Sequence, residues 1–317
     1  MSDPTTMKAA VFDRYGPPER LSVTRVPIPE PKPGELRVRV RATTVTRTDT
    51  ATLRAHPFFA RAMTGWVRPR MHILGMDFAG EVDALGAGVT GYAVGDRVFG
   101  LLPDHFGGHA EFVCVGAQAA VAPIPDKIAF HEAVVGEGAW YASSTTDGLR
   151  SGQSCLIYGA SGAIGTAAVQ LAKAQGAEVT AVVGTRHLDL AARLGADRVV
   201  NYEAEDFTAL GPTFDLVMDA VGHTSWFACR RLLKPGGVFS ATDLGPFWSN
   251  ILLGAVSRRV GTPYPNDAPG FVWRLAGMLG AGTFAGVFDR SYALEDIVEA
   301  FRYVETGQKT GIVTIRM

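Results

Sequence analysis

The chain has 317 residues, 47% of them hydrophobic, and a formal net charge of -1 at pH 7. This length suggests two domains, and the near-neutral charge provides no basic field for nucleic acid or an anionic membrane. No apolar run reaches membrane-spanning length, and residues 1–6 lack a signal core, so we expect a cytoplasmic protein. The three cysteines, Cys114, Cys155 and Cys229, are far apart in apolar stretches, which predicts reduced, buried thiols.

Residues 1–123 contain short strand patterns separated by glycine and proline turns, which predicts a β-rich, barrel-like unit. Residues 35–42 alternate between polar and apolar, the mark of a half-buried strand. The arginines of this strand are expected on its solvated face. The other strands expected here cover residues 7–12, 77–84, 97–101 and 109–115.

From residue 155 onward, strand and helix patterns alternate, which predicts a doubly wound parallel sheet. An apolar run at 155–158 leads into a glycine loop, and an amphipathic helix at 162–175 leaves it. This arrangement holds a pyrophosphate at the positive end of a helix, where side chains would block the approach of the backbone. The residues expected to bind a dinucleotide there are Gly159, Ser161, Gly162, Ala163, Ile164 and Gly165.

Further units of this sheet follow, with strands expected at 178–183, 214–219 and 238–242, a turn and a strand within 195–202, and helices at 186–194 and 225–233. The carboxyl ends of parallel strands face the cofactor crevice. Contacts with the dinucleotide are therefore also expected after the fourth and fifth strands, from Ala220, Val221, Gly222 and Leu244.

The end of the second strand indicates which dinucleotide is bound. NAD-specific folds place an acid about twenty residues after the glycine loop to take the ribose 2′-hydroxyl, and residues 182–187 contain none. Gly184 leaves room for a 2′-phosphate, Thr185 can donate a hydrogen bond to it, and Arg186 can pair with it. This argument favours NADPH. The alternative is that Arg186 is an ordinary exposed residue of the following helix.

The last part of the chain returns to short elements after prolines at 263, 265 and 269. Helices are expected at 271–279 and, with a clear apolar face, at 294–304. Strands are expected at 284–289 and 310–316.

Three glycine-containing motifs, together with the glycine loop, resemble the medium-chain dehydrogenases/reductases in residue type and order. The motifs are Gly-Met-Asp-Phe-Ala-Gly-Glu-Val at 75–82, Val-Gly-Asp-Arg-Val-Phe-Gly at 94–100 and Gly-Gly-His-Ala-Glu-Phe at 107–112. The resemblance implies an α/β protein with a GroES-like catalytic domain, residues 1–123 completed by 266–317, and a Rossmann-type NADPH-binding domain, residues 124–265. It also implies an active site between the domains and a homodimer formed through the cofactor domains.

Within this superfamily the chain is most similar to the zinc-free, quinone oxidoreductase-like branch. Zinc-using relatives carry a cysteine where Thr46 stands and a histidine where Met76 stands. Neither a threonine hydroxyl nor an isolated thioether is a normal zinc ligand. We therefore expect no metal site.

The resemblance implies an NADPH-dependent oxidoreductase that transfers a hydride to a small electrophilic substrate: a quinone, an enone or a related activated alkene. Such acceptors are already polarised, so alignment with the cofactor supplies most of the rate. Thr46 and Tyr141 are the candidate catalytic residues, as hydrogen-bond donors to the reacting carbonyl. Tyr202 resembles the family's tyrosine near the adenosine phosphate.

Two alternatives remain open at this point: an NADPH-dependent carbonyl reductase or alcohol dehydrogenase, and a non-catalytic NADPH-binding protein. Many relatives carry asparagine where Thr46 stands and a tyrosine a few residues later, whereas residues 51–53 here are Ala-Thr-Leu. This departure predicts a differently shaped substrate pocket. Residues 58–66 mix aromatic and basic side chains, so they form either a wall of that pocket or a packed helix and loop.

Overall fold

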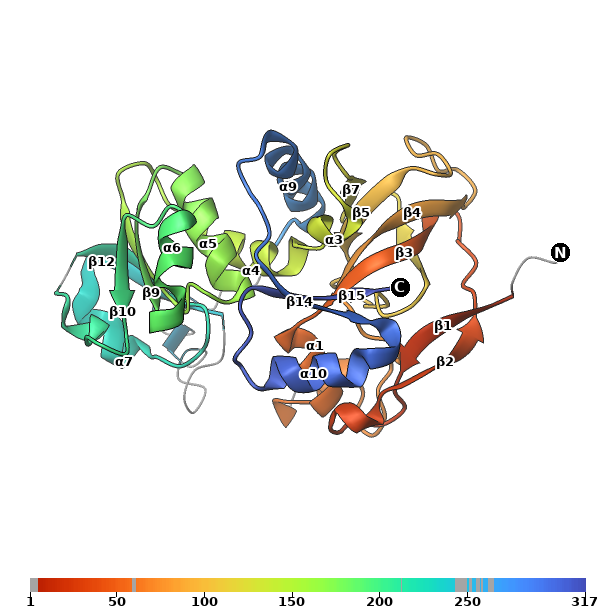
Figure 1. Cartoon of the computed structure of the whole chain (residues 1–317), viewed down its shortest axis with the longest axis horizontal. Helices are drawn as coiled ribbons and strands as arrows, with labels where there is room; N and C mark the ends of the chain where they lie inside the picture. The colour runs from red at the N-terminus through yellow and green to blue at the C-terminus, as the bar shows by residue number, and fades with distance from the viewer. Residues whose placement is uncertain are drawn as a thin grey trace. The chain divides into compact units, whose positions relative to one another are not determined.

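The computed structural model describes residues 5–58, 61–211, 213–242, 250, 253–254, 257, 259–261 and 265–317. The chain divides into two compact units: Met1–Gly136 with Asp267–Met317, and Glu137–Asn266. The C-terminal segment belongs to the first unit because its last two strands, β14 (Phe288–Ala293) and β15 (Ile312–Arg316), extend the sheet that contains β3 (Glu35–Val45) (Figure 1). Among the described residues, no helix is both long and apolar enough to cross a bilayer.

The first unit continues to Gly136, beyond residue 123, where the sequence suggested a boundary. The sheet holds this extra segment. β7 (Val121–Pro123) pairs with β5 (Arg97–Leu101), and Ile124 N–H donates to the carbonyl of Arg97 at 2.8 Å. The Arg97 guanidinium then donates to the carbonyl of Ile128 at 2.5 Å. The prolines at 123 and 125 therefore do not separate the units.

The larger sheet of the first unit has the order β14-β15-β3-β4-β5-β7, and β6 also pairs with β3. A separate antiparallel pair is formed by β1 and β2. The remaining strands of this unit are β1 (Thr6–Val11), β2 (Ser22–Pro27), β3 (Glu35–Val45), β4 (Asp77–Leu85), β6 (Phe112–Gly116), β14 (Phe288–Ala293) and β15 (Ile312–Arg316). Its helices are α1 (Arg47–Arg54), α2 (Arg61–Thr64), α3 (Phe130–Ala133), α9 (Ala268–Ala281) and α10 (Ile297–Glu305).

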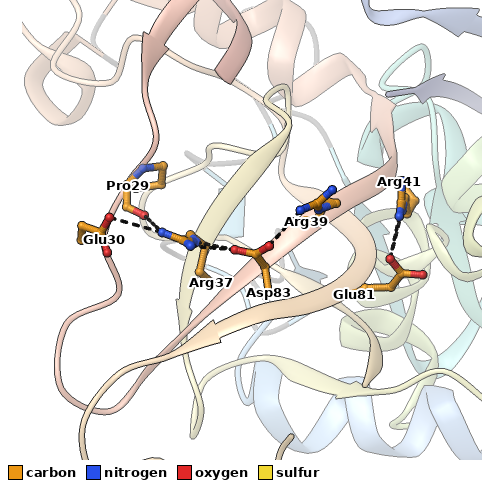
Figure 2. A network of polar contacts seen from close by, with 7 residues as sticks. All are labelled: Pro29, Glu30, Arg37, Arg39, Arg41, Glu81 and Asp83. Carbon is orange, nitrogen blue, oxygen red and sulfur yellow. Dashed lines mark hydrogen bonds and ion pairs between the residues drawn. The ribbon is translucent and has the colours of Figure 1, made fainter. Parts of the chain in front are cut away.

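The alternation predicted for residues 35–42 is confirmed in β3. Leu36, Val38 and Val40 are buried in the core of the sheet, and the intervening arginines point the other way. Arg37 and Arg39 both donate to the Asp83 carboxylate, at 2.8 and 3.1 Å, and Arg41 bonds Glu81 on the same neighbouring strand, β4 (Figure 2). The arginines on this face of β3 therefore form ion pairs with carboxylates of β4, which largely neutralise their positive charge.

The second unit contains a parallel sheet with the order β10-β9-β8-β11-β12-β13. Numbered within the unit, this is the order 3-2-1-4-5-6 of dinucleotide-binding folds, which confirms the doubly wound α/β class. Its strands are β8 (Ser154–Tyr158), β9 (Glu178–Val183), β10 (Arg198–Asn201), β11 (Phe214–Asp219), β12 (Leu233–Ala241) and β13 (Val260–Gly261). The helices are α4 (Gly136–Thr146), which begins at the boundary, α5 (Ala163–Ala174), α6 (Leu188–Arg193) and α7 (Trp226–Cys229).

Three sequence predictions are wrong in extent. The helix expected at 225–233 is only α7 followed by a 3-10 turn, Arg230–Leu232. Strand β12 begins earlier than expected, at Leu233, because Leu233 already pairs with Phe214 of β11. The register then shifts across the Pro-Gly-Gly segment, and the pairing resumes at Val238. The strand expected at 284–289 begins only at Phe288, where it meets the start of β15.

Candidate dinucleotide site and active-site residues

The glycine loop lies at the carboxyl end of β8, the central strand beside the point where the strand order reverses. Gly159 has a φ of +80°, and a Cβ there would lie 1.9 Å from Val221 Cγ2 in the loop after β11. A Cβ on Gly165 would lie 2.1 Å from the carbonyl oxygen of Gly159. These two glycines are therefore required by close packing within the unit.

Gly162 has a different role because the space in front of it is open. A Cβ on Gly162 would come no closer than 3.7 Å to any described neighbouring atom, the Gly159 oxygen. Gly162 is the N-cap of α5, and within the described residues no side chain caps this terminus and no acid lies in its first turn. The N–H groups of Ala163 and Ile164 thus begin a helix whose positive end is open to an anion. These residues fit a dinucleotide pyrophosphate.

The loop after β11 is organised by Asp219, which the sequence analysis did not single out. Its buried carboxylate accepts hydrogen bonds from the N–H groups of Val221 at 2.9 Å, Gly222 at 2.8 Å and Thr224 at 2.8 Å. Burial raises the pKa of Asp219. Since the Val221 and Gly222 N–H groups turn inward to Asp219, contacts from this loop to a cofactor would come from carbonyl oxygens and from Ala220 or Val221 atoms. The expected contact at Leu244 lies outside the described residues.

The end of β9 is not free of acid, although residues 182–187 contain none. Asn201, the last residue of β10, pairs with Val183, so the residues after β10 lie beside those after β9. Glu203 accepts hydrogen bonds from the N–H and the hydroxyl of Thr185, at 3.2 and 2.5 Å. A Cβ on Gly184 would lie 2.8 Å from Glu203 Oε1 and 3.0 Å from the Tyr202 hydroxyl. The space expected at Gly184 is therefore filled.

In the first unit, Thr46 is the N-cap of α1 and forms a capping box with Asp49. The Thr46 hydroxyl donates to Asp49 Oδ2 at 2.9 Å and accepts the Asp49 N–H at 3.2 Å. The other oxygen of this buried carboxylate accepts the Gly75 N–H at 2.9 Å. The single hydroxyl proton of Thr46 is thus already directed to Asp49, and donation to a substrate would require breaking that bond.

The residues at the zinc-ligand positions of relatives do not fit zinc. Thr46 is held in its capping box, and Met76 is 3% exposed and offers only a thioether. The nearby His109 is buried and donates from Nε2 to the carbonyl of Thr44 at 2.7 Å, so this ring nitrogen is used by the backbone. Across the described ranges, no group of three or more His, Cys, Asp or Glu residues is arranged to hold a metal ion.

Tyr141, the second catalytic candidate, lies on α4 in the second unit, whereas Thr46 lies in the first. Tyr141 is partly exposed, and its ring lies 5.9 Å from that of Trp140. Trp140 is buried and donates from Nε1 to the carbonyl of Asn266 at 3.3 Å. Trp140 therefore serves packing, while Tyr141 remains a candidate.

Two family models match the chain. The model of the alcohol dehydrogenase GroES-like domain covers residues 32–126, and the model of a zinc-binding dehydrogenase covers residues 194–314. A 2-methylene-furan-3-one reductase of Solanum lycopersicum is 31% identical over 78% of this chain, and a mitochondrial NAD(P)H oxidoreductase of Mus musculus is 30% identical over 77%. The chain spans 64% of the length of the first and 70% of the second. A polyketide synthase of Streptomyces halstedii is 31% identical over 78% of this chain, and the match covers 5% of the length of that synthase.

Solved structures agree with the two-unit fold. A quinone oxidoreductase from Coxiella burnetii superposes with a TM-score of 0.87 at 27% identity, over 98% of this chain and 99% of that one. An NAD-dependent alcohol dehydrogenase superposes with a TM-score of 0.85 at 26% identity, over 98% of this chain and all of the other.

A GroES-like unit followed by a doubly wound sheet with an open glycine loop is the architecture of oxidoreductases that bind a nicotinamide cofactor. With the relatives above, the chain belongs to the medium-chain dehydrogenase/reductase superfamily, in its quinone oxidoreductase-like branch.

Proposed function

We propose that this chain is a zinc-independent reductase that transfers a hydride from a reduced nicotinamide dinucleotide to a quinone, an enone or a related activated alkene. The observation that carries the proposal is the state of the zinc-ligand positions. The Thr46 hydroxyl is engaged with Asp49, and Met76 is buried as a thioether. Without a Lewis acid to lower the pKa of an alcohol, alcohol oxidation is disfavoured. An acceptor that is already polarised does not need that assistance.

When bound, the reduced nicotinamide ring supplies a hydride. The chain's own part is to hold the reactants in line. The open start of α5 at Gly162 would hold the pyrophosphate, and the loop fixed by Asp219 would limit movement of the bound dinucleotide. Hydride addition to the electron-poor carbon leaves an enolate or a hydroquinone anion, which takes one proton from water. Tyr141 is the side chain we propose as a hydrogen-bond donor to the oxygen that gains charge.

The names of the relatives support this substrate class, since they include a furanone reductase and a quinone oxidoreductase. For the dinucleotide, Arg186 supports the NADPH expected from the sequence, whereas the Glu203 carboxylate beside Gly184 opposes a 2′-phosphate. Both dinucleotides therefore belong in the assay.

The test is oxidation of NADPH and of NADH by the purified chain with 1,4-naphthoquinone, simple enones and aldehydes, each with and without a chelator. We expect turnover of the quinone or the enones that the chelator leaves unchanged. Turnover confined to aldehydes would support a carbonyl reductase instead. Tight dinucleotide binding without turnover of any acceptor would contradict the enzyme proposal and favour a binding protein.

A further inference from the structure

We propose that Glu203 selects between the two dinucleotides in this chain, favouring the 2′-hydroxyl of NADH over the 2′-phosphate of NADPH. This inference rests on the dinucleotide binding in the proposed function, and it reverses the preference that Arg186 alone would give. It depends on where one carboxylate lies and on which donors it uses.

The carboxylate occupies the place that a 2′-phosphate would need. Glu203 Oε1 lies 2.8 Å from the position of a Cβ on Gly184, the residue whose missing side chain was expected to make room. Glu203 Oε2 accepts both the N–H and the hydroxyl of Thr185, the donors expected to bind the phosphate. Space and donors are thus taken by one side chain.

Neighbouring contacts hold Glu203 in this position. Asn201 Oδ1 accepts the backbone N–H of Glu203 at 3.0 Å, and Asn201 Nδ2 donates to the Thr185 hydroxyl at 2.9 Å. Because its hydroxyl accepts from Asn201, Thr185 is oriented to donate its own proton to Glu203. The arrangement links the ends of β9 and β10 through side chains as well as through the pairing of Asn201 with Val183.

Charge acts in the same direction. The Thr185 hydrogen bonds hold the pKa of Glu203 below its usual range, with a smaller contribution from the Arg186 charge, so the carboxylate is ionised at neutral pH. An ionised carboxylate repels a phosphate dianion but accepts a hydrogen bond from a ribose hydroxyl. Dinucleotide folds that prefer NAD place an acid directly after the second strand of the sheet; here the acid comes from the end of the third strand.

The test measures dissociation constants of the full chain for NADH and NADPH, and for the adenosine-end probes 5′-AMP and 2′,5′-ADP, by calorimetry. It compares the wild type with Glu203→Gln. The matched control is Glu205→Gln, which removes the same charge from an exposed residue two positions along. Because Glu203 is also exposed, neither substitution should affect folding.

We expect the wild type to bind NADH at least as tightly as NADPH, and AMP at least as tightly as 2′,5′-ADP. Glu203→Gln should bind NADPH and 2′,5′-ADP about tenfold more tightly than the wild type does. Its affinity for NADH should be unchanged or lower. The Glu205→Gln control should not show this change in the ratio of the two affinities. A wild type that prefers the 2′-phosphorylated ligands, with the same ratio in Glu203→Gln, would overturn the inference. These binding measurements do not depend on turnover, so an inactive chain that shows the shift would refute only the proposed reaction.

Discussion

Thr46 and Asp49 share a reciprocal pair of hydrogen bonds: the hydroxyl donates to the carboxylate at 2.9 Å and accepts the Asp49 N–H at 3.2 Å. The Thr46 N–H also donates to the same carboxylate oxygen, at 2.9 Å. A residue at the position of a metal ligand in relatives is thus used here to start helix α1. The consequence is that substitutions at Thr46 should act on stability as well as on catalysis.

Replacing Thr46 tests its effect on stability. Thr46→Val keeps the shape but removes the cap, so the free energy of unfolding should fall by about 1 kcal/mol. Thr46→Ser keeps the hydroxyl and should remain close to the wild type. Chemical denaturation of the three proteins measures the difference. Equal stability of Thr46→Val and Thr46→Ser would show that the capping box contributes nothing.

Gly159→Ala should weaken dinucleotide binding while leaving most of the fold intact. Its φ of +80° disfavours a side chain, and the added Cβ would lie 1.9 Å from Val221 Cγ2. The loop must therefore shift, and the pyrophosphate site with it. Calorimetric titration with NADH and NADPH should show at least about a tenfold loss. The matched control is Gly148→Ala, because a Cβ there would meet no described atom within 4 Å; equal losses in both variants would contradict the packing argument.

The three cysteines should resist alkylation in the folded protein. Burial raises the pKa of Cys155 to about 12 and the pKa values of Cys114 and Cys229 to about 11. At pH 8, therefore, only about one thiol in a thousand at Cys114 or Cys229 is the reactive thiolate. Mass spectrometry after iodoacetamide treatment at pH 8 should find slow labelling of the native chain and three rapid additions in urea. Rapid labelling of native Cys155 would disprove this burial.

The pair Lys173–Asp197 should make a pH-dependent contribution to stability. Lys173 Nζ bonds both Asp197 oxygens, at 2.9 and 2.8 Å, and together with the Val179 N–H it holds the pKa of Asp197 below its usual range. A depressed carboxyl pKa stabilises the folded state above the ordinary pKa of about 4 and loses that effect as the pH falls through the folded-state value.

Asp197→Asn should accordingly lower stability by at most about 1 kcal/mol at pH 7, because the pair is partly exposed and screened by solvent. The difference from the wild type should narrow as the pH falls through the folded-state pKa of Asp197, because the wild-type carboxylate then becomes protonated. Urea denaturation at pH 7 and at acidic pH values measures this difference. A difference that stays constant between them would mean that the effect is not ionic.

The sequence was most informative where a local pattern determines the structure. The strands at 97–101, 178–183 and 214–219 are confirmed at both ends, and so is the glycine loop at the carboxyl end of β8. The sequence was least informative where a site depends on contact with a residue that is distant in the chain. Glu203 could not be found by inspecting 182–187, because only the pairing of β10 with β9 brings it to Thr185. The signal available was the strand order: residues after the third strand lie beside those after the second.

The order in which the first unit can be completed follows from the pairing of β15 with β3, which joins Val313 to Val45. During synthesis, β3 leaves the ribosome long before β15, its neighbour on that side, because β15 lies much later in the chain. Until then this edge of β3 exposes unpaired backbone groups, as edge strands that invite association with other chains do. The parallel sheet of the second unit, which is formed within Glu137–Asn266 and therefore precedes β15, can form during that interval. A chain truncated before β15 would keep the parallel sheet of the second unit, but the edge of β3 that pairs with β15 would stay unpaired and prone to association with other chains.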